Sequence, residues 1–159
     1  MANKMRYLRG PEVEAYIAKS GTVSIDEGDL LKINSAGAIT PASTSGDYTG
    51  LVAVAKGASP TTDPSGAKVP VYLIGFGTVF EFICGTTTVA FPFGYPMKIT
   101  GKQTLSKKTA TSITKSATTA VAVVAEGMAV SGSSVKVIFK QSKLFSQIGR
   151  KLSGAVGTW

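Results

Sequence analysis

Three short blocks of this 159-residue chain occur twice, in the same order along the sequence. Both copies of the first block begin with glycine and end in Lys-Ile, the second block is rich in alanine and valine, and the third alternates valine with other residues. A duplicated unit would determine the architecture, because both halves would then form the same set of strands. The alternative is that strands rich in alanine, valine and glycine resemble one another by composition alone. The blocks and their second copies are 28–33 and 94–99, 50–57 and 120–127, and 69–73 and 135–139, displaced by 66, 70 and 66 residues.

Side chains alternate along two segments, 78–84 and 135–140, as they do in half-buried β-strands. Further short strand candidates are separated by turns that contain glycine, serine or proline. The sequence therefore predicts an all-β fold, a compact barrel or sandwich of short strands built from two related halves. Pro70 and Pro96 lack an amide donor, so we expect their strands to lie at sheet edges or to bulge there. Residues that share a face are Phe80, Phe82 and Cys84, and Val135, Val137 and Phe139; the other strand candidates are 22–26, 29–34, 51–56, 69–74, 95–100 and 120–126.

The two ends of the chain differ in character from the middle. A basic start, Gly10-Pro11 and a short charged run favour an extended arm at the N-terminus. At the C-terminus, apolar residues recur at helical spacing, and three interpretations stay open: a helix packed on its own domain, a partner-binding tail or a membrane-surface element. The expected divisions are an N-terminal arm at 1–21, a β domain at 22–141 with repeat halves at 22–75 and 88–141, and a C-terminal tail at 142–159.

We expect both ends to bind another protein subunit, because neither is needed to complete the core that the repeat describes. Large apolar side chains contribute roughly 1.5–3 kcal/mol each when buried, whereas exposed ion pairs contribute under about 1 kcal/mol. Apolar contacts should therefore dominate attachment. The expected partner-binding residues are Arg6, Tyr7 and Leu8 in the arm and Leu144, Phe145, Ile148, Leu152 and Trp159 in the tail.

The composition excludes several kinds of chemistry. The chain contains no histidine, so it has no imidazole base, no His-based triad and no imidazole metal ligand. Its single cysteine, Cys84, excludes a structural zinc cluster and an intrachain disulfide. The sequence also lacks a recognisable targeting segment, and its most apolar window, 69–84, is interrupted by proline, glycine and glutamate. We therefore expect a protein made in a cytosol, with no catalytic residue, no cofactor, no metal and no membrane span.

Three features invite a functional interpretation, and each has a simpler structural one. Asp26-Glu-Gly-Asp29 offers oxygen ligands for calcium, but its spacing is not that of a twelve-residue calcium loop, and a turn entering a strand is favoured. Glu81, in an apolar strand, is an active-site candidate, although a carboxylate that faces solvent or pairs with a lysine on a neighbouring strand is favoured. Cys84 is expected to be a small buried hydrophobe rather than a nucleophile.

The positive charge is unevenly distributed along the chain. The net charge of +8 divides into −1 for residues 1–97 and +9 for residues 98–159. Such asymmetry is typical of a surface that binds nucleic acid or another polyanion, so a basic nucleic-acid-binding module using residues 98–151 is the alternative function. The lysines of this region are not interleaved with aromatic residues, which favours a solvated face or an interface for an acidic protein partner.

Five segments together resemble the small capsid decoration proteins, or cement proteins, of tailed bacteriophages. The resemblance covers roughly residues 20–140 and depends on a Gly-Asp-hydrophobic strand, a Val-Ala strand and a Gly-x-Val-Phe-Glu strand. The segments are Gly-Asp-Leu-Leu-Lys-Ile (28–33), Gly-Leu-Val-Ala-Val-Ala (50–55), Val-Pro-Val-Tyr-Leu (69–73), Gly-Thr-Val-Phe-Glu-Phe (77–82) and Gly-Tyr-Pro-Met-Lys-Ile (94–99).

This resemblance implies a non-enzymatic virion structural protein. Such a protein binds the outer surface of an assembled icosahedral capsid, often as a homotrimer, and stabilises contacts between subunits of the major capsid protein. It would be made in the host cytoplasm and reside on the capsid surface of the virion. Nucleic acid and membrane are not expected partners.

Overall fold

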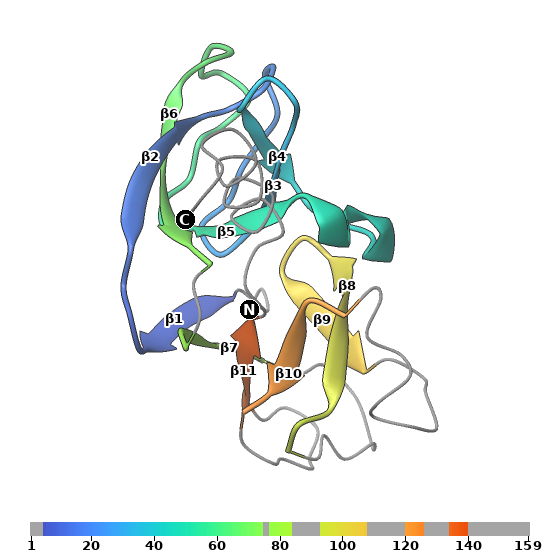
Figure 1. The fold of residues 1–159 in the computed structure, drawn as a ribbon. Helices are drawn as coiled ribbons and strands as arrows, with labels where there is room; N and C mark the ends of the chain where they lie inside the picture. Colours follow the sequence, from blue (N-terminus) through green and yellow to red (C-terminus); the bar gives the residue numbers. More distant parts are fainter. Residues whose placement is uncertain (1–4, 75–76, 84–92, 108–119, 126–133, 140–159) are drawn as a thin grey trace, which may run out of the picture.

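The computed structural model describes residues 5–74, 77–83, 93–107, 120–125 and 134–139, which form two antiparallel β-sheets and one short 3-10 helix (Figure 1). The predicted all-β fold is confirmed. The strands are β1 (Arg6–Arg9), β2 (Glu14–Ala18), β3 (Leu30–Ile33), β4 (Ile39–Pro41), β5 (Leu51–Ala55), β6 (Lys68–Leu73), β7 (Val79–Ile83), β8 (Pro96–Gly101), β9 (Thr104–Lys107), β10 (Ala122–Val124) and β11 (Ser134–Phe139); the helix η1 is Ser45–Thr49.

The two sheets pack as a sandwich rather than closing into one barrel. The six-stranded sheet has the order β1-β7-β11-β10-β8-β9, and the five-stranded sheet has the order β2-β6-β5-β3-β4. In Figure 1 the five-stranded sheet lies above the six-stranded one. The five-stranded sheet curls until its edges meet at a single parallel bridge between Lys19 and Ile39. Among the described residues no continuous ladder joins β2 to β4, so the sheet stays open.

The strand order repeats, as the recurring sequence blocks predict. The first unit is the five-stranded sheet, β2-β6-β5-β3-β4, and the second unit is β7-β11-β10-β8-β9. The two units correspond strand for strand, and β1 is added at the edge of β7. The ladders also share their register. The ladders place the middle block at a displacement of 69 residues rather than the expected 70. Corresponding pairs are Val54↔Tyr72 and Val123↔Ile138, Leu31↔Pro41 and Met97↔Lys107, and Tyr16↔Pro70 and Glu81↔Lys136.

The expected boundaries of the units need correction at their N-terminal ends. The first unit begins with β2 at residue 14 rather than at residue 22, and the second begins with β7 at residue 79 rather than at residue 88. Residues 6–9 and 14–18 are extended, as expected of an arm, but they belong to the two sheets. The expected strand at 22–26 is absent from the structure, where Ile25 forms only an isolated bridge with Ser59.

The core consists of two apolar clusters, of which the larger holds the two sheets together. The larger cluster combines side chains of both sheets, among them Leu30 and Val54 from the upper sheet and Phe80 and Phe139 from the lower one. The smaller cluster fills the inner side of the curled five-stranded sheet and includes Val52 and other β5, β6 and β3 residues. Because β5 contributes to both clusters, all five of its residues are buried. A strand covered on both faces reads as a continuous apolar run, which is the pattern of Leu-Val-Ala-Val-Ala.

The two prolines occupy positions where a missing amide donor costs little. The sequence predicts a sheet edge or a bulge at Pro70, and because β6 is a central strand, the sheet edge is wrong. Pro70 instead lies where β5 ends, and its carbonyl accepts hydrogen bonds from the amides of Lys56 (2.9 Å) and Gly57 (3.3 Å). Pro96 is the first residue of β8, also a central strand. Strand ends and first positions tolerate proline because the ladder needs no donor there.

Candidate interaction surface

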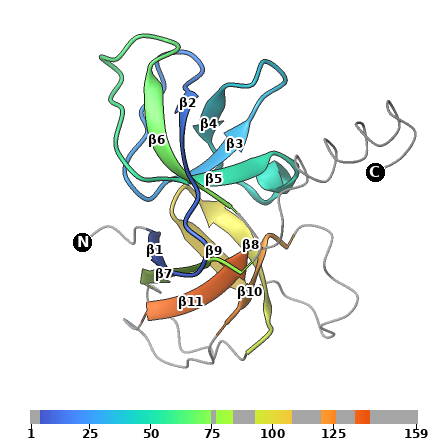
Figure 2. The same ribbon diagram turned by 60° about the vertical axis from the view of Figure 1, so that its left-hand side comes forward.

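The N-terminal segment, residues 5–18, crosses both sheets and is the first candidate surface. β1 extends the six-stranded sheet, β2 forms an edge of the five-stranded sheet, and residues 10–13 connect them (Figure 2). Gly10 adopts a φ of +100°, and a Cβ there would lie 2.4 Å from the Gly77 carbonyl oxygen. The Thr78 hydroxyl donates a 2.6 Å hydrogen bond to the Pro11 carbonyl. The connection is therefore held closely against the start of β7.

Arg6 pairs with Glu81 across the β1–β7 ladder. The guanidinium donates to the Glu81 carboxylate, whose residue is 5% exposed, while the Arg6 side chain remains 68% exposed. Lys136 of β11 lies opposite Glu81 on the other side. The expectation that Glu81 faces solvent is wrong, since the residue is buried. The carboxylate does pair with a cation on a neighbouring strand, the guanidinium of Arg6 in the N-terminal segment.

Tyr7 packs into its own domain. Its ring stacks on Tyr72 at a centroid distance of 5.3 Å and meets Phe80 edge-on at 6.1 Å, and its hydroxyl donates to the Gly10 carbonyl at 2.8 Å. Met5, just before β1, is 2% exposed within the larger cluster. The expectation that the N-terminus is not needed for the core is therefore wrong for residues 5–9. Leu8 is half-buried at the irregular point of the β1–β7 ladder.

The remaining expected partner-binding residues, Leu144, Phe145, Ile148, Leu152 and Trp159, lie outside the described residues, as does Cys84. The described residues instead reveal other exposed apolar side chains that the sequence prediction missed. Tyr16 is 69% exposed, Phe93 74% and Val13 48%. The exposure of Tyr16 could have been predicted from the alternation of residues 14–17. Successive side chains of a strand point to opposite faces, so Tyr16 shares a face with the charged Glu14, and Ala15 shares the other face with Ile17.

A buried carboxylate connects the two units. Asp29, before β3, is wholly buried, and its carboxylate accepts hydrogen bonds from Lys102 Nζ (3.1 Å), Gln103 Nε2 (2.8 Å) and the Asp26 amide (2.9 Å). Lys102 and Gln103 belong to the β8–β9 turn, whose Lys102 carbonyl also accepts from the Leu30 amide. Burial lowers the pKa of the Lys102 ammonium, but the bond to Asp29 and the charges of Asp29 and Asp26 outweigh burial and raise it.

These donors favour a structural role for the acidic cluster rather than a calcium site. Each oxygen of Asp29 already accepts from a protein donor, and a lysine supplies the neutralising charge. The cluster is a turn entering β3, as favoured from the sequence. In the part of the chain that the structure describes, no group of three or more acidic, cysteine or histidine side chains is placed to hold a metal ion.

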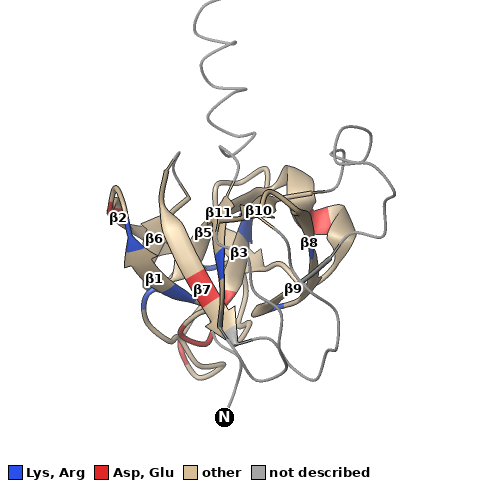
Figure 3. Ribbon diagram, turned by 90° about the horizontal axis from the view of Figure 1, so that it is seen from below, with Lys and Arg blue, Asp and Glu red and all other residues tan. Residues whose placement is uncertain are grey.

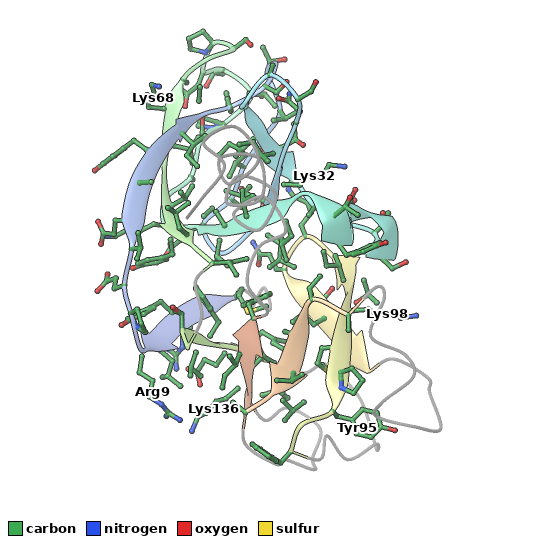
Figure 4. All side chains as sticks on the ribbon, viewed as in Figure 1. Arg9, Lys32, Lys68, Tyr95, Lys98 and Lys136 are labelled. Carbon is green, nitrogen blue, oxygen red and sulfur yellow. The ribbon has the colours of Figure 1, made fainter. Side chains whose placement is uncertain are left out.

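The basic residues described in the second unit do not gather into one stripe. Lys102 is paired with Asp29, and Lys98 and Lys136 lie on strands separated by β10 (Figure 4). Figure 3 shows lysine and arginine positions on both sheets, interspersed with acidic ones. Six of the ten basic residues of 98–151 lie outside the described residues, so the nucleic-acid-binding alternative stays a prediction.

Comparison of the chain with protein-family models finds no match, and no curated protein matches it. Within the described ranges, no helix has the length and apolar content needed to cross a membrane.

Proposed function

We propose that this chain is a non-enzymatic structural protein of a tailed-phage virion. In this proposal it binds the outer surface of an assembled capsid, as a homotrimer, and stabilises contacts between neighbouring subunits of the major capsid protein. The protein would be made in the host cytoplasm and incorporated into the virion. Regular repetition over a shell would convert a weak contact of each copy into stable attachment.

The observation that carries the proposal is the duplicated β unit itself. The sequence blocks that resemble decoration proteins are β3, β5, β6, β7 and β8, which are strands of two equivalent sheets packed on a shared core. The buried charged side chains of the described residues are all engaged. Asp29 pairs with Lys102, Glu81 pairs with Arg6, and the Lys19 ammonium donates to the carbonyls of Val23 (3.2 Å) and Pro60 (2.6 Å). No buried side-chain nitrogen or oxygen of the described residues lacks a hydrogen-bond partner. This arrangement suits a stable adhesive module.

The test uses the major capsid protein encoded in the same genome, assembled into empty shells. Purified chain is mixed with the shells at low and high salt, the mixture is sedimented, and the shells are imaged by electron microscopy. The expected result is saturable binding that persists at high salt, with extra density on the outer surface at threefold positions. Unassembled capsid subunits serve as the control and should bind weakly.

The same salt series separates the proposal from a nucleic-acid-binding function. Phosphate contacts release counterions, so binding to a DNA duplex falls steeply as salt rises. Tight, salt-sensitive binding to DNA without binding to shells would contradict the capsid proposal.

A further inference from the structure

Two tyrosine rings from different sheets lie stacked on each other. Tyr7 belongs to β1 of the six-stranded sheet, and Tyr72 belongs to β6 of the five-stranded sheet, whose lower end descends toward β1 in Figure 1. Their ring centroids are 5.3 Å apart, and the ring planes differ by 21°. In an offset stack of this kind, edge carbons of one ring lie in van der Waals contact with the other ring. The fold therefore brings two phenols into direct contact from strands that are far apart in sequence.

The surrounding contacts hold both rings in place. Phe80 meets Tyr7 edge-on at 6.1 Å and Tyr72 edge-on at 6.3 Å. The Tyr7 hydroxyl donates to the Gly10 carbonyl at 2.8 Å, and Lys56 Nζ lies 5.4 Å from the centroid of the Tyr72 ring. Both tyrosines are half-buried, so a small oxidant in solution can reach them. Two groups held together in this way react far more readily with each other than two groups that meet by diffusion.

We propose that Tyr7 and Tyr72 form an oxidative cross-linking site, at which a one-electron oxidant such as a peroxide-derived radical joins the two rings as dityrosine. Each phenol loses one electron to the oxidant and its O–H proton to water. The two radicals then couple, and a bond forms between one ring carbon next to each oxygen. Each of these carbons releases its hydrogen as a proton, and each oxygen regains a proton. The product is thus two hydrogen atoms lighter, and the oxidant has accepted two electrons.

This bond would give the chain a covalent tie that cysteine chemistry cannot supply, and it is independent of the proposed capsid function. The chain contains one cysteine, so an intrachain disulfide is impossible. A bond between Tyr7 and Tyr72 would fasten the edge strand of one sheet to a central strand of the other. Because it would close a long loop in the unfolded chain, it should stabilise the fold against urea.

The test is photo-oxidation of the full-length protein, at micromolar concentration, with tris(bipyridyl)ruthenium(II) and persulfate. The expected product is a monomeric chain with dityrosine fluorescence. Trypsin should release the peptide 7–9 joined to the peptide 69–98, and fragmentation should place the bond at Tyr72 rather than at Tyr95, which the second peptide also contains. Absence of this joined pair from the folded, oxidised protein would overturn the proposal.

Phenylalanine variants separate the stacked pair from general tyrosine reactivity. Tyr7→Phe and Tyr72→Phe each keep a ring in the stack but remove one phenol, so each should abolish the joined peptides. Tyr16→Phe is the matched control, because Tyr16 is 69% exposed and its removal should leave the yield of the joined peptides unchanged. Links through Tyr16 in the absence of a Tyr7–Tyr72 link would show that exposure rather than stacking directs the reaction, and would contradict the proposal.

Oxidation in urea is a control that depends on no variant. In the unfolded chain the two rings meet only by chance, so the yield of the Tyr7–Tyr72 link should fall by about tenfold or more. The cross-linked chain, separated from the unreacted chain, should also unfold at a higher urea concentration. Equal yields from the folded and the unfolded chain would refute the proposal.

Discussion

Replacing Lys102 with methionine tests whether the buried Asp29 carboxylate connects the two units. The substitution keeps an apolar stem but removes the cation, so Asp29, whose side chain is 1% exposed, retains only Gln103 and the Asp26 amide as donors. Removing one partner of a fully buried pair costs about 3–5 kcal/mol. Lys102 is 38% exposed, so water replaces part of the lost interaction, and we expect a loss of about 2 kcal/mol.

Urea unfolding followed by circular dichroism measures this loss. Asp29→Asn should lower the free energy of unfolding by a similar amount, because the amide nitrogen of asparagine would face hydrogen-bond donors. The double variant should lower it by about 1–2 kcal/mol less than the sum of the two single losses. Lys56→Met is the matched control, since its partner Glu14 is 41% exposed, and it should cost much less. Additive losses at Lys102 and Asp29, or a Lys102→Met loss no larger than that of the control, would refute the connection.

Three further predictions concern pH, the N-terminal segment and the tail. Burial raises the pKa of Asp47, but hydrogen bonds from Lys32 and the Ser43 and Thr44 amides outweigh it and lower the pKa from 3.8 to about 2. This carboxylate therefore stabilises the fold above about pH 4, and its contribution, about 1 kcal/mol after discounting for the partly exposed Lys32, is lost as the pH falls toward 2. The unfolding midpoint of Asp47→Asn, measured across this range, should fall less than that of the wild type. Tyr7→Ala should destabilise the domain by about 2 kcal/mol in urea unfolding, because it removes a half-buried ring from Tyr72 and Phe80, and an unchanged midpoint would show that the ring does not support the core. Deleting residues 142–159 should leave the melting temperature unchanged and abolish shell binding, and a collapsed melting temperature with intact binding would assign the tail to the domain.

The fold was largely predictable because its information is local and repeated. Alternation in 135–140 places Val135, Val137 and Phe139 on the buried face that the structure shows. The ordered blocks predict the shared strand order. The predicted displacement of the middle block, 70 residues, differs by one from the observed 69. Alanine and valine occupy nearly every position of both copies, so two alignments that differ by one residue match equally well. Only the hydrogen-bonded ladders distinguish them.

The N-terminal segment and the ion pairs could not be predicted, since they depend on residues far apart in the chain. Arg6 and Glu81 are 75 residues apart, and the short strand 6–9 carries no periodicity of its own. The Asp29–Lys102 contact brings together two turns, each of which reads alone as a solvated loop. In both cases the partner is determined by the packing of one unit on the other.

The position of β1 has a consequence for the order of events during synthesis. β1 is synthesised before the other described strands, yet its ladder partner among the described residues is β7, about seventy residues later. All strands of the first unit are made before that partner is available. Closing so long a loop is slow compared with forming a hairpin such as β8–β9. Although β1 is synthesised before the other described strands, it is therefore expected to be among the last of them to dock, and the docking of residues 5–9 on β7 should set the slow phase of folding.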